Sequence, residues 1–142
     1  MNSPAKVKFL TSIQELLPPF NWPPDSYIIA GSGPMAMRGI REAVDIDILV
    51  NTSLWSVLEQ QYEAIGATKN EIVIGRLEIW KDWMNLTEKI DEMIENREMM
   101  EGFPFMRLSY VIDWKQYLGR PKDIVDIGLI KDYLQRNGNF FS

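Results

Sequence analysis

The stretch that decides the fold runs from Tyr27 to Val50 and reads YIIAGSGPMAMRGIREAVDIDILV. Its opening apolar residues are typical strand formers, and a Gly-Ser-Gly sequence then interrupts them with residues that tolerate tight turns. Pro34 suits the first position of a short helix, with Ser32 or Gly33 as its N-cap. Gly39 is expected to end that helix in a left-handed cap. The free backbone amides at this turn are therefore expected to face a phosphate group.

Two carboxylates open the next predicted strand. Asp45 and Asp47 stand at positions i and i+2, so both side chains point to one face of the strand, about 7 Å apart. Hard cations such as Mg²⁺ or Mn²⁺ select oxygen ligands and commonly combine one or two carboxylates with substrate phosphates. The glycine turn and the aspartate pair therefore suggest a metal-assisted phosphate site. Each motif alone is also typical of simpler structure, namely solvated aspartates and an ordinary loop.

Helical periodicity marks most of the remaining chain. Apolar residues recur at helical spacing in residues 5–17, 54–65 and 85–94. Asn85 and Glu88 have the spacing of a capping box. Ser109 is expected to cap a helix that Gly119 ends, and the residues from Pro121 to Leu134 predict a last amphipathic helix.

Strand patterns complete the expected fold. Residues 71–74 and 77–80 are separated by Gly75-Arg76, a two-residue connection that predicts a β-hairpin, and residues 105–108 predict a short edge strand. The sequence therefore predicts an α/β domain in which a small mixed β-sheet is flanked by helices. Residues 1–142 are expected to form this single domain, with its core at about 27–134. An alternative for residues 85–94 is a lid, with flexible residues near Gly102 beyond it.

Composition excludes several kinds of chemistry. The 142 residues contain no cysteine and no histidine, so thiolate and imidazole metal sites, disulfides and Ser-His-Asp catalysis are excluded. Carboxylates, lysines and metal-bound oxygens remain as the groups that could take part in catalysis. Lys and Arg total 15 against 20 Asp and Glu, and the net charge of -5 disfavours broad, nonspecific nucleic-acid binding. With no signal-like segment and no apolar run of about 18 residues, a cytoplasmic protein without a membrane partner is expected.

Two separated motifs, in order, resemble a known family. The Gly31-Ser32 turn, a short helix, Arg41 and the Asp45-Ile46-Asp47 strand resemble the nucleotidyltransferase superfamily of the DNA polymerase β type, in its minimal prokaryotic form. Residues 115–127, KQYLGRPKDIVDI, are similar to the K-x-x-x-G-R-P-K-D-x-x-D-I signature of these proteins and their toxin-antitoxin relatives. The chain departs from the family pattern at Ala43, where members often carry a hydroxyl residue.

The resemblance implies a function and a set of roles. It implies Mg²⁺-dependent transfer of a nucleoside monophosphate from a nucleoside triphosphate to a hydroxyl acceptor, which is an RNA, a protein or a small molecule. Asp45 and Asp47 would hold the metal. Family members carry a third carboxylate on a later strand, for which alternation favours Glu78 and leaves Asp82 as the alternative. The remaining implied roles are phosphate binding at the glycine turn and charge neutralisation or orientation, assigned to Gly31, Ser32, Arg41, Lys115, Arg120 and Asp126.

Two alternatives to an active enzyme remain open from the sequence. The chain could be the antitoxin or interaction half of a toxin-antitoxin pair, or a nucleotide-binding protein that has lost transfer activity. Lys115, Arg120 and Lys122 also fit an exposed, charge-rich helix end.

Overall fold

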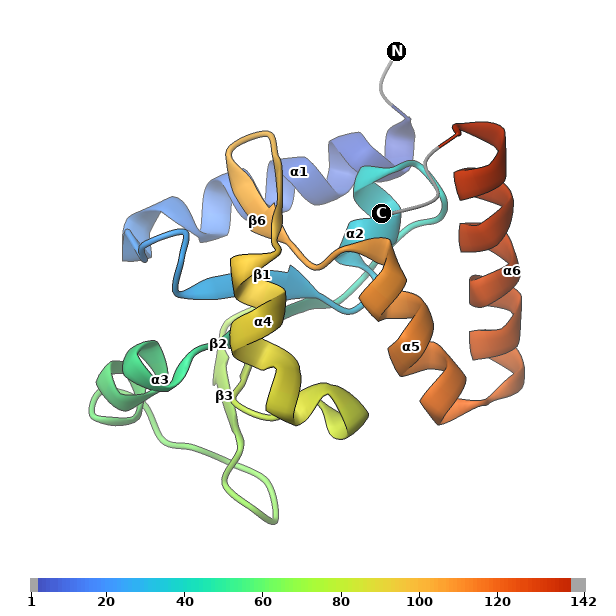
Figure 1. Cartoon of the computed structure of the whole chain (residues 1–142). Helices are drawn as coiled ribbons and strands as arrows, with labels where there is room; N and C mark the ends of the chain where they lie inside the picture. The colour runs from blue at the N-terminus through green and yellow to red at the C-terminus, as the bar shows by residue number, and fades with distance from the viewer. Residues whose placement is uncertain (1–2, 139–142) are drawn as a thin grey trace.

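A six-stranded mixed β-sheet forms the centre of the protein (Figure 1), whose structure is a computed structural model describing residues 3–138. The spatial order of the strands is β3-β4-β2-β1-β6-β5. Their bounds are β1 (Tyr27–Ala30), β2 (Ile46–Val50), β3 (Glu71–Ile74), β4 (Leu77–Trp80), β5 (Glu98–Met100) and β6 (Phe103–Phe105). β2 is antiparallel to β1 and parallel to β4, so the predicted mixed α/β architecture is confirmed.

Six α-helices and two short 3₁₀ helices, η1 and η2, surround the sheet within the described residues. The helices are α1 (Pro4–Leu16), η1 (Pro18–Phe20), α2 (Gly33–Met37), α3 (Thr52–Glu59), η2 (Met84–Lys89), α4 (Ile90–Glu95), α5 (Leu108–Leu118) and α6 (Pro121–Arg136). Figure 1 shows α5 and α6 side by side as an antiparallel pair at one end of the sheet. None of the helices between residues 3 and 138 is both long and apolar enough to cross a membrane.

Strand alternation divides the interior into two cores. Along β1, Tyr27 and Ile29 join a cluster with α1 and α3, whereas Ile28 and Ala30 join a second cluster with α4, α5 and α6. This is the period-two pattern of a strand buried on both faces. Asp47 and Trp80 alternate with residues of the first cluster, so their side chains lie on the sheet face that α4, α5 and α6 cover.

The Tyr27–Val50 unit folds as expected. β1 ends at Ala30, and α2 follows with Ser32 as its N-cap residue and Pro34 in its first turn. Gly39 has a φ of +70°, which is the left-handed conformation predicted for the cap. The predicted hairpin is also confirmed, because β3 and β4 pair antiparallel around Gly75, whose φ is +59°.

The prediction of a helix over residues 54–65 is wrong in its second half. α3 begins earlier, because the side chain of Asn51 accepts a hydrogen bond from the backbone N–H of Leu54 at 2.9 Å, and it ends at Glu59. Ile65 instead donates its N–H to the carbonyl of Glu71 at 2.7 Å and forms an isolated β-bridge. Apolar spacing at Ile65 therefore reflected an extension of the hairpin and not another helical turn.

The segment predicted as one helix over residues 85–94 is a 3₁₀ helix, η2, followed by α4. Asn85 lies inside η2 and does not cap it, so the predicted capping box is wrong. The hydroxyl of Thr87 instead accepts the N–H of Trp83 at 2.9 Å. This local bond favours a tighter first turn over a regular helix start.

The predicted edge strand over residues 105–108 is also wrong. Glu101 and Gly102 have φ values of +53° and +84°, which make a tight turn between β5 and β6. The strand that follows, β6, begins at Phe103 and ends at Phe105. It lies between β1 and β5, so it is not an edge strand of the sheet. α5 begins at Leu108, with Arg107 as its N-cap, so Ser109 is a residue of the helix and not its cap.

Candidate functional site

Sheet register places two of the predicted carboxylates side by side. Asp47 on β2 lies opposite Ala30 of β1 and beside Glu78 of the parallel strand β4. Asp45 is exposed and comes just before β2. Asp82 lies beyond the end of β4, where it lines a separate pocket at the opposite end of β2. The arrangement therefore favours Glu78 over Asp82 as the third carboxylate of a site at Asp47.

The glycine turn packs directly on Asp47. Gly31 has a φ of +65°, and a Cβ atom placed on it would lie 2.4 Å from Oδ2 of Asp47. No side chain fits at that distance without displacing the carboxylate, and the left-handed backbone itself disfavours other residues. The close contact gives Gly31 a physical reason to be glycine. It also brings the Gly31-Ser32 turn and the aspartate strand together, as expected from the sequence.

The carboxylates on these strands lack basic partners in the part of the chain that the structure describes. No lysine or arginine within residues 3–138 makes an ion pair with Asp45, Asp47 or Glu78, which we call the strand-edge carboxylates. Burial raises the pKa of Asp47 to about 6; the hydrogen bond from Trp80 opposes this increase, and the nearby Asp45 and Glu71 add to it. Burial likewise raises the pKa of Glu78 to about 7, and repulsion from Asp47, Asp45 and Glu71 adds to this increase. Ionisation of Asp47 and Glu78 is therefore unfavourable unless a positive charge comes close to them.

The C-terminal motif forms a second acidic group, on α6. Asp123 and Asp126, which we call the α6 carboxylates, are both buried. The buried ammonium group of Lys115 lies 2.9 Å from Oδ2 of Asp126 and 3.6 Å from Oδ1 of Asp123. Lys115 and Asp126 therefore meet across the turn before α6, and burial keeps Lys115 from facing an open cleft. Gly119 permits that turn, because it has a φ of +61° at the end of α5.

Basic partners surround the α6 carboxylates. Asp123 accepts a backbone hydrogen bond from Arg120 at 3.1 Å and two more from its guanidinium, so it also caps α6. These bonds lower the pKa of Asp123 despite its burial, and Lys115 adds to the effect. For Asp126 burial works to raise the pKa, but the hydrogen bonds from Arg41 and Lys115 outweigh it, so the pKa falls below its usual range.

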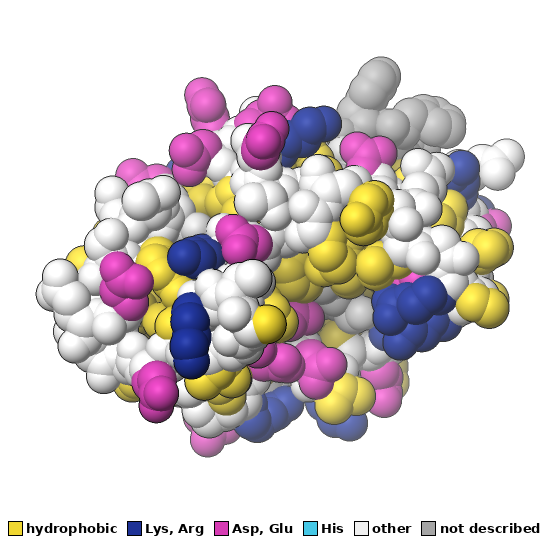
Figure 2. All heavy atoms as spheres, turned by 90° about the horizontal axis from the view of Figure 1, so that it is seen from below, with side chains coloured by type: hydrophobic (Ala, Val, Ile, Leu, Met, Phe, Trp, Pro, Cys, Tyr) yellow, Lys and Arg dark blue, Asp and Glu magenta, His cyan; other side chains and the backbone are white. Residues whose placement is uncertain are grey.

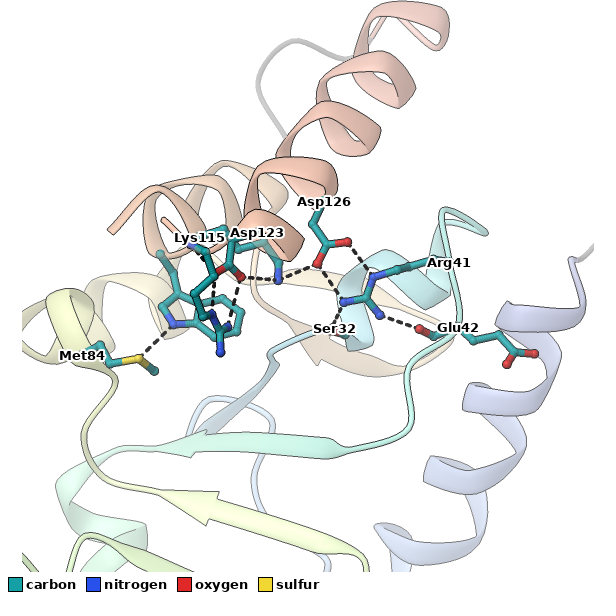
Figure 3. Close-up of polar contacts among 9 residues, drawn as sticks. Ser32, Arg41, Glu42, Met84, Lys115, Asp123 and Asp126 are labelled. Carbon is teal, nitrogen blue, oxygen red and sulfur yellow. Dashed lines mark hydrogen bonds and ion pairs between the residues drawn. The ribbon is translucent and has the colours of Figure 1, made fainter. Parts of the chain in front are cut away.

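Arg41 joins the two parts of the site (Figure 3). Its guanidinium forms a two-pronged pair with Asp126, with Nε 2.8 Å from Oδ1 and Nη2 2.9 Å from Oδ2. Nη2 also donates to the hydroxyl of Ser32 at 2.7 Å, and Nη1 donates to the carbonyl of Glu42 at 2.7 Å. Three motifs that are distant in sequence, namely the glycine turn, the arginine and the C-terminal signature, therefore meet at one end of the sheet.

A row of three neighbouring tryptophans forms a second connection, which the sequence analysis missed. The indole N–H of Trp80 donates to Oδ1 of Asp47 at 3.2 Å. The Trp80 ring centroid lies 5.9 Å from that of Trp83, which lies 4.8 Å from that of Trp114. The ammonium group of Lys115 lies 4.7 Å from the centroid of the Trp114 ring. Strand alternation alone placed Trp80 on the Glu78 face, but no local signal linked it to Trp83 or Trp114.

The donor chemistry of the strand-edge carboxylates fits a hard divalent cation, because all of their ligand atoms are oxygens. Among residues 3–138, however, no three histidine, cysteine, aspartate or glutamate side chains are grouped closely enough to hold a metal ion. Asp47 and Glu78 are register neighbours, and Asp45 is the exposed member. One or two carboxylates with substrate phosphates are a sufficient ligand set for Mg²⁺, so the residues fit the ion in that form.

Acidic and basic side chains are interspersed on the surface. Figure 2 shows acidic side chains near the centre of one face, beside exposed hydrophobic side chains, with Lys and Arg side chains to their right, to their left and below them. The chain as a whole carries a net charge of -5.

No protein-family model matches the chain, and a search of the curated proteins finds no significant match.

Proposed function

We propose that the protein is a nucleotidyltransferase that moves a nucleoside monophosphate from a nucleoside triphosphate to a hydroxyl acceptor. The observation that supports this most is the bridge of Arg41 between Ser32 and Asp126, because it unites the glycine turn with the C-terminal motif. Gly31 packs on Asp47 from the same turn. A phosphate-binding turn, a hard-cation ligand set and a cationic bridge are the parts that phosphoryl transfer requires.

Asp45 and Asp47, with Glu78 as the third carboxylate, would hold Mg²⁺ or Mn²⁺. When bound, the ion would neutralise the triphosphate and polarise the phosphoryl oxygens. These carboxylates have no basic partner among residues 3–138, which supports the assignment because a cation would supply the missing positive charge. Glu78 either completes this ligand set or accepts the proton of the attacking hydroxyl.

The turn and the basic residues would bind the triphosphate. α2 has only five residues, so phosphate binding rests on the amides of Gly31 and Ser32 and on the Ser32 hydroxyl, with little help from a helix dipole. The Arg41 side chain is 35% exposed and adjoins that hydroxyl, so it would contact phosphate directly. Lys115 is only 3% exposed and lies against two aspartates, so it would act through Asp126 by holding Arg41 in place.

The chemical step balances without a further reactant. The acceptor oxygen forms a bond to the α-phosphorus, and the bond from that phosphorus to the bridging oxygen of the β-phosphate breaks. Pyrophosphate leaves, and the hydroxyl proton passes to a carboxylate or to water. The adjoining Gly31-Ser32 turn would restrain the β- and γ-phosphates, while Arg120, which lies at the exposed start of α6, would offset charge at the rim of the site.

The test uses two radioactive labels. The purified protein is incubated with Mg²⁺, cell extract and NTPs labelled at either the α- or the γ-phosphate. Transfer predicts that α-label enters a macromolecule or small acceptor and that γ-label does not. Nuclease and protease treatment then separates RNA, protein and small-molecule acceptors.

Two variants provide the matched comparison. Asp45→Asn with Asp47→Asn should abolish transfer and metal-dependent NTP binding, since both charges of the ligand pair are removed. Asp82→Asn, which changes an aspartate at the opposite end of β2, should leave both unchanged. Equal activity in the double variant and the wild type would overturn the proposed function.

One observation supports a second candidate function, the interaction half of a toxin-antitoxin pair. α5 and α6 expose large apolar side chains on their outer surface, with Tyr117 63%, Ile124 64% and Val125 62% exposed. Adjacent exposed apolar residues commonly mark protein-binding surfaces. Co-expression with the product of a neighbouring gene should give a complex that Val125→Glu dissociates, and a monomeric wild type in that experiment would reject this candidate.

A further inference from the structure

We propose that Trp80 is a positioning residue for Asp47: its indole N–H fixes the carboxylate in the orientation that binds a divalent cation. The inference rests on the proposed function, because it assumes that Asp47 is a metal ligand. No part of the sequence resemblance points to this tryptophan. It rests instead on the contact between the indole nitrogen and Oδ1 of Asp47 at 3.2 Å.

Asp47 is held from two sides. Trp80 donates to Oδ1, and the backbone of Gly31 packs against Oδ2 so closely that a Cβ atom there would lie 2.4 Å away. Within residues 3–138 no other side chain donates a hydrogen bond to this carboxylate. Trp80 is therefore the one polar side chain that sets the rotation of the Asp47 carboxylate in the described part of the chain.

The indole is itself held in place. β4 pairs with β2 and β3, so the backbone of Trp80 lies between Leu49 and Glu71. Its ring meets the buried ring of Trp83 edge to face, and Trp83 packs on Trp114. An aromatic donor with neighbours on the strand and at the ring loses little side-chain freedom when it forms its hydrogen bond.

Side chains that donate a hydrogen bond to a metal ligand change metal affinity in a measurable way. A donor to a carboxylate ligand sets its rotation and spreads its charge, and removing such a partner typically costs about 10-fold to 100-fold in metal affinity. Loss of the indole N–H leaves the carboxylate free to rotate, so part of its binding orientation is lost before the ion arrives. The hydrogen bond from Trp80 still leaves lone pairs of the Asp47 carboxylate free for the cation, because each carboxylate oxygen has two lone pairs.

The first variant is Trp80→Phe, and the chain offers a matched control. Trp55 on α3 also donates its indole N–H to a carboxylate, Oε2 of Glu59 at 3.0 Å, and it is also largely buried. Trp55→Phe makes the same chemical change away from Asp47. With Mn²⁺ and a nucleoside triphosphate together as the probe, measured by calorimetry, Trp80→Phe should weaken binding about 10-fold. Trp55→Phe should bind Mn²⁺ as the wild type does.

A second variant separates the hydrogen bond from the packing. Replacing Trp80 with benzothienylalanine keeps two fused rings and their contacts but puts sulfur in place of the N–H group. The inference predicts the same loss of Mn²⁺ affinity as in Trp80→Phe, together with an unchanged melting temperature. In the wild type labelled with ¹⁵N-tryptophan, the Trp80 indole resonance should shift on addition of Mg²⁺, and Asp47→Asn should abolish that shift.

The outcomes distinguish the two proposals. If the wild type binds Mn²⁺ and the benzothienylalanine variant binds it equally well, the positioning role is overturned while the proposed function stands. If the wild type binds no Mn²⁺ even with a nucleoside triphosphate present, both are overturned. If the benzothienylalanine variant binds normally and only Trp80→Phe is weakened, the ring packing and not the hydrogen bond matters, which also contradicts the inference.

Discussion

The protein contains two acidic groups that differ in how their charge is balanced. The strand-edge carboxylates have no basic partner in the described chain, and the pKa values of Asp47 and Glu78 are raised. The α6 carboxylates have three basic neighbours, and the pKa values of Asp123 and Asp126 are lowered. Arg41 connects the second group to the glycine turn that packs on the first.

The comparison separates the effect of burial from the effect of partners. Asp123 and Asp126 are 0% and 6% exposed, so they are more buried than the half-buried Asp47 and Glu78. Burial works to raise the pKa of all four carboxylates. The pKa values of Asp123 and Asp126 nevertheless fall, because Arg41, Lys115 and Arg120 supply charge and hydrogen bonds. The charge of the α6 carboxylates is therefore balanced within the described part of the chain, whereas the charge of the strand-edge carboxylates is not.

The largest expected effect comes from breaking the α6 group. Asp126→Ala removes the partner of Arg41 and the nearer partner of the buried Lys115, which leaves a buried charge poorly compensated. We expect the free energy of unfolding, measured with urea, to fall by about 3 kcal/mol. Asp132→Ala removes an exposed aspartate of the same helix that pairs with Arg136, and it should cost no more than about 0.5 kcal/mol. Similar losses of unfolding free energy in the two variants would contradict the conclusion that basic side chains balance the charge of the α6 carboxylates.

The contact between the glycine turn and the strand-edge group is tested by two glycines. Gly31 and Gly75 both have positive φ, +65° and +59°, but only Gly31 has a close neighbour, Oδ2 of Asp47. Gly75→Ala should cost about 1 kcal/mol of stability from backbone strain alone. Gly31→Ala should cost about 1–2 kcal/mol more, since the carboxylate must move, and it should also weaken NTP binding. Equal stability losses and normal NTP binding would show that the contact is unimportant.

Removal of one carboxylate charge should change the free energy of unfolding in opposite directions in the two groups. In EDTA, Asp47→Asn removes an uncompensated carboxylate and should raise the free energy of unfolding by about 1 kcal/mol, after allowance for screening by water. Asp126→Asn removes a compensated one and should lower it. The measurement is urea unfolding followed by tryptophan fluorescence. A destabilised Asp47→Asn protein would mean that the strand-edge group is already balanced.

The smallest expected effect is the pH dependence of stability without metal. Asp47 and Glu78 have folded-state pKa values of about 6 and about 7, above the values of roughly 4 in unfolded chains. Between these values the folded protein binds more protons than the unfolded chain, so stability should fall as the pH rises from about 5 to 7. Asp123 and Asp126 have lowered pKa values, so their contribution is complete above pH 4 or so and is lost as the pH falls through their folded-state pKa.

Melting temperatures in EDTA should therefore pass through a maximum near pH 5. Asp47→Asn should flatten the decline on the neutral side and leave the acid side unchanged. A stability that rises steadily from pH 5 to 7.5 would contradict the raised pKa values of the strand-edge group.

Local sequence predicted the elements whose signals lie within a few residues. The strand, turn, short helix and strand between Tyr27 and Val50 followed from apolar runs, glycine and proline. The hairpin around Gly75 and the start of α6 at Pro121 followed in the same way. The end of α3 and the β5–β6 hairpin were missed, because Ile65 and the Glu101-Gly102 turn acquire their conformations from strand pairing.

The sequence by itself determined the chemistry available to the site: oxygen ligands and basic side chains, with no thiol and no imidazole. It also placed a glycine turn and two aspartates within one short unit, because turn formation and strand alternation are local properties. Only the tertiary structure decided which carboxylates obtain a basic partner. Arg41 and Asp126 are 85 positions apart, and Trp80 reaches Asp47 across 33 positions. Such pairs depend on the packing of helices on the sheet, which no local pattern specifies.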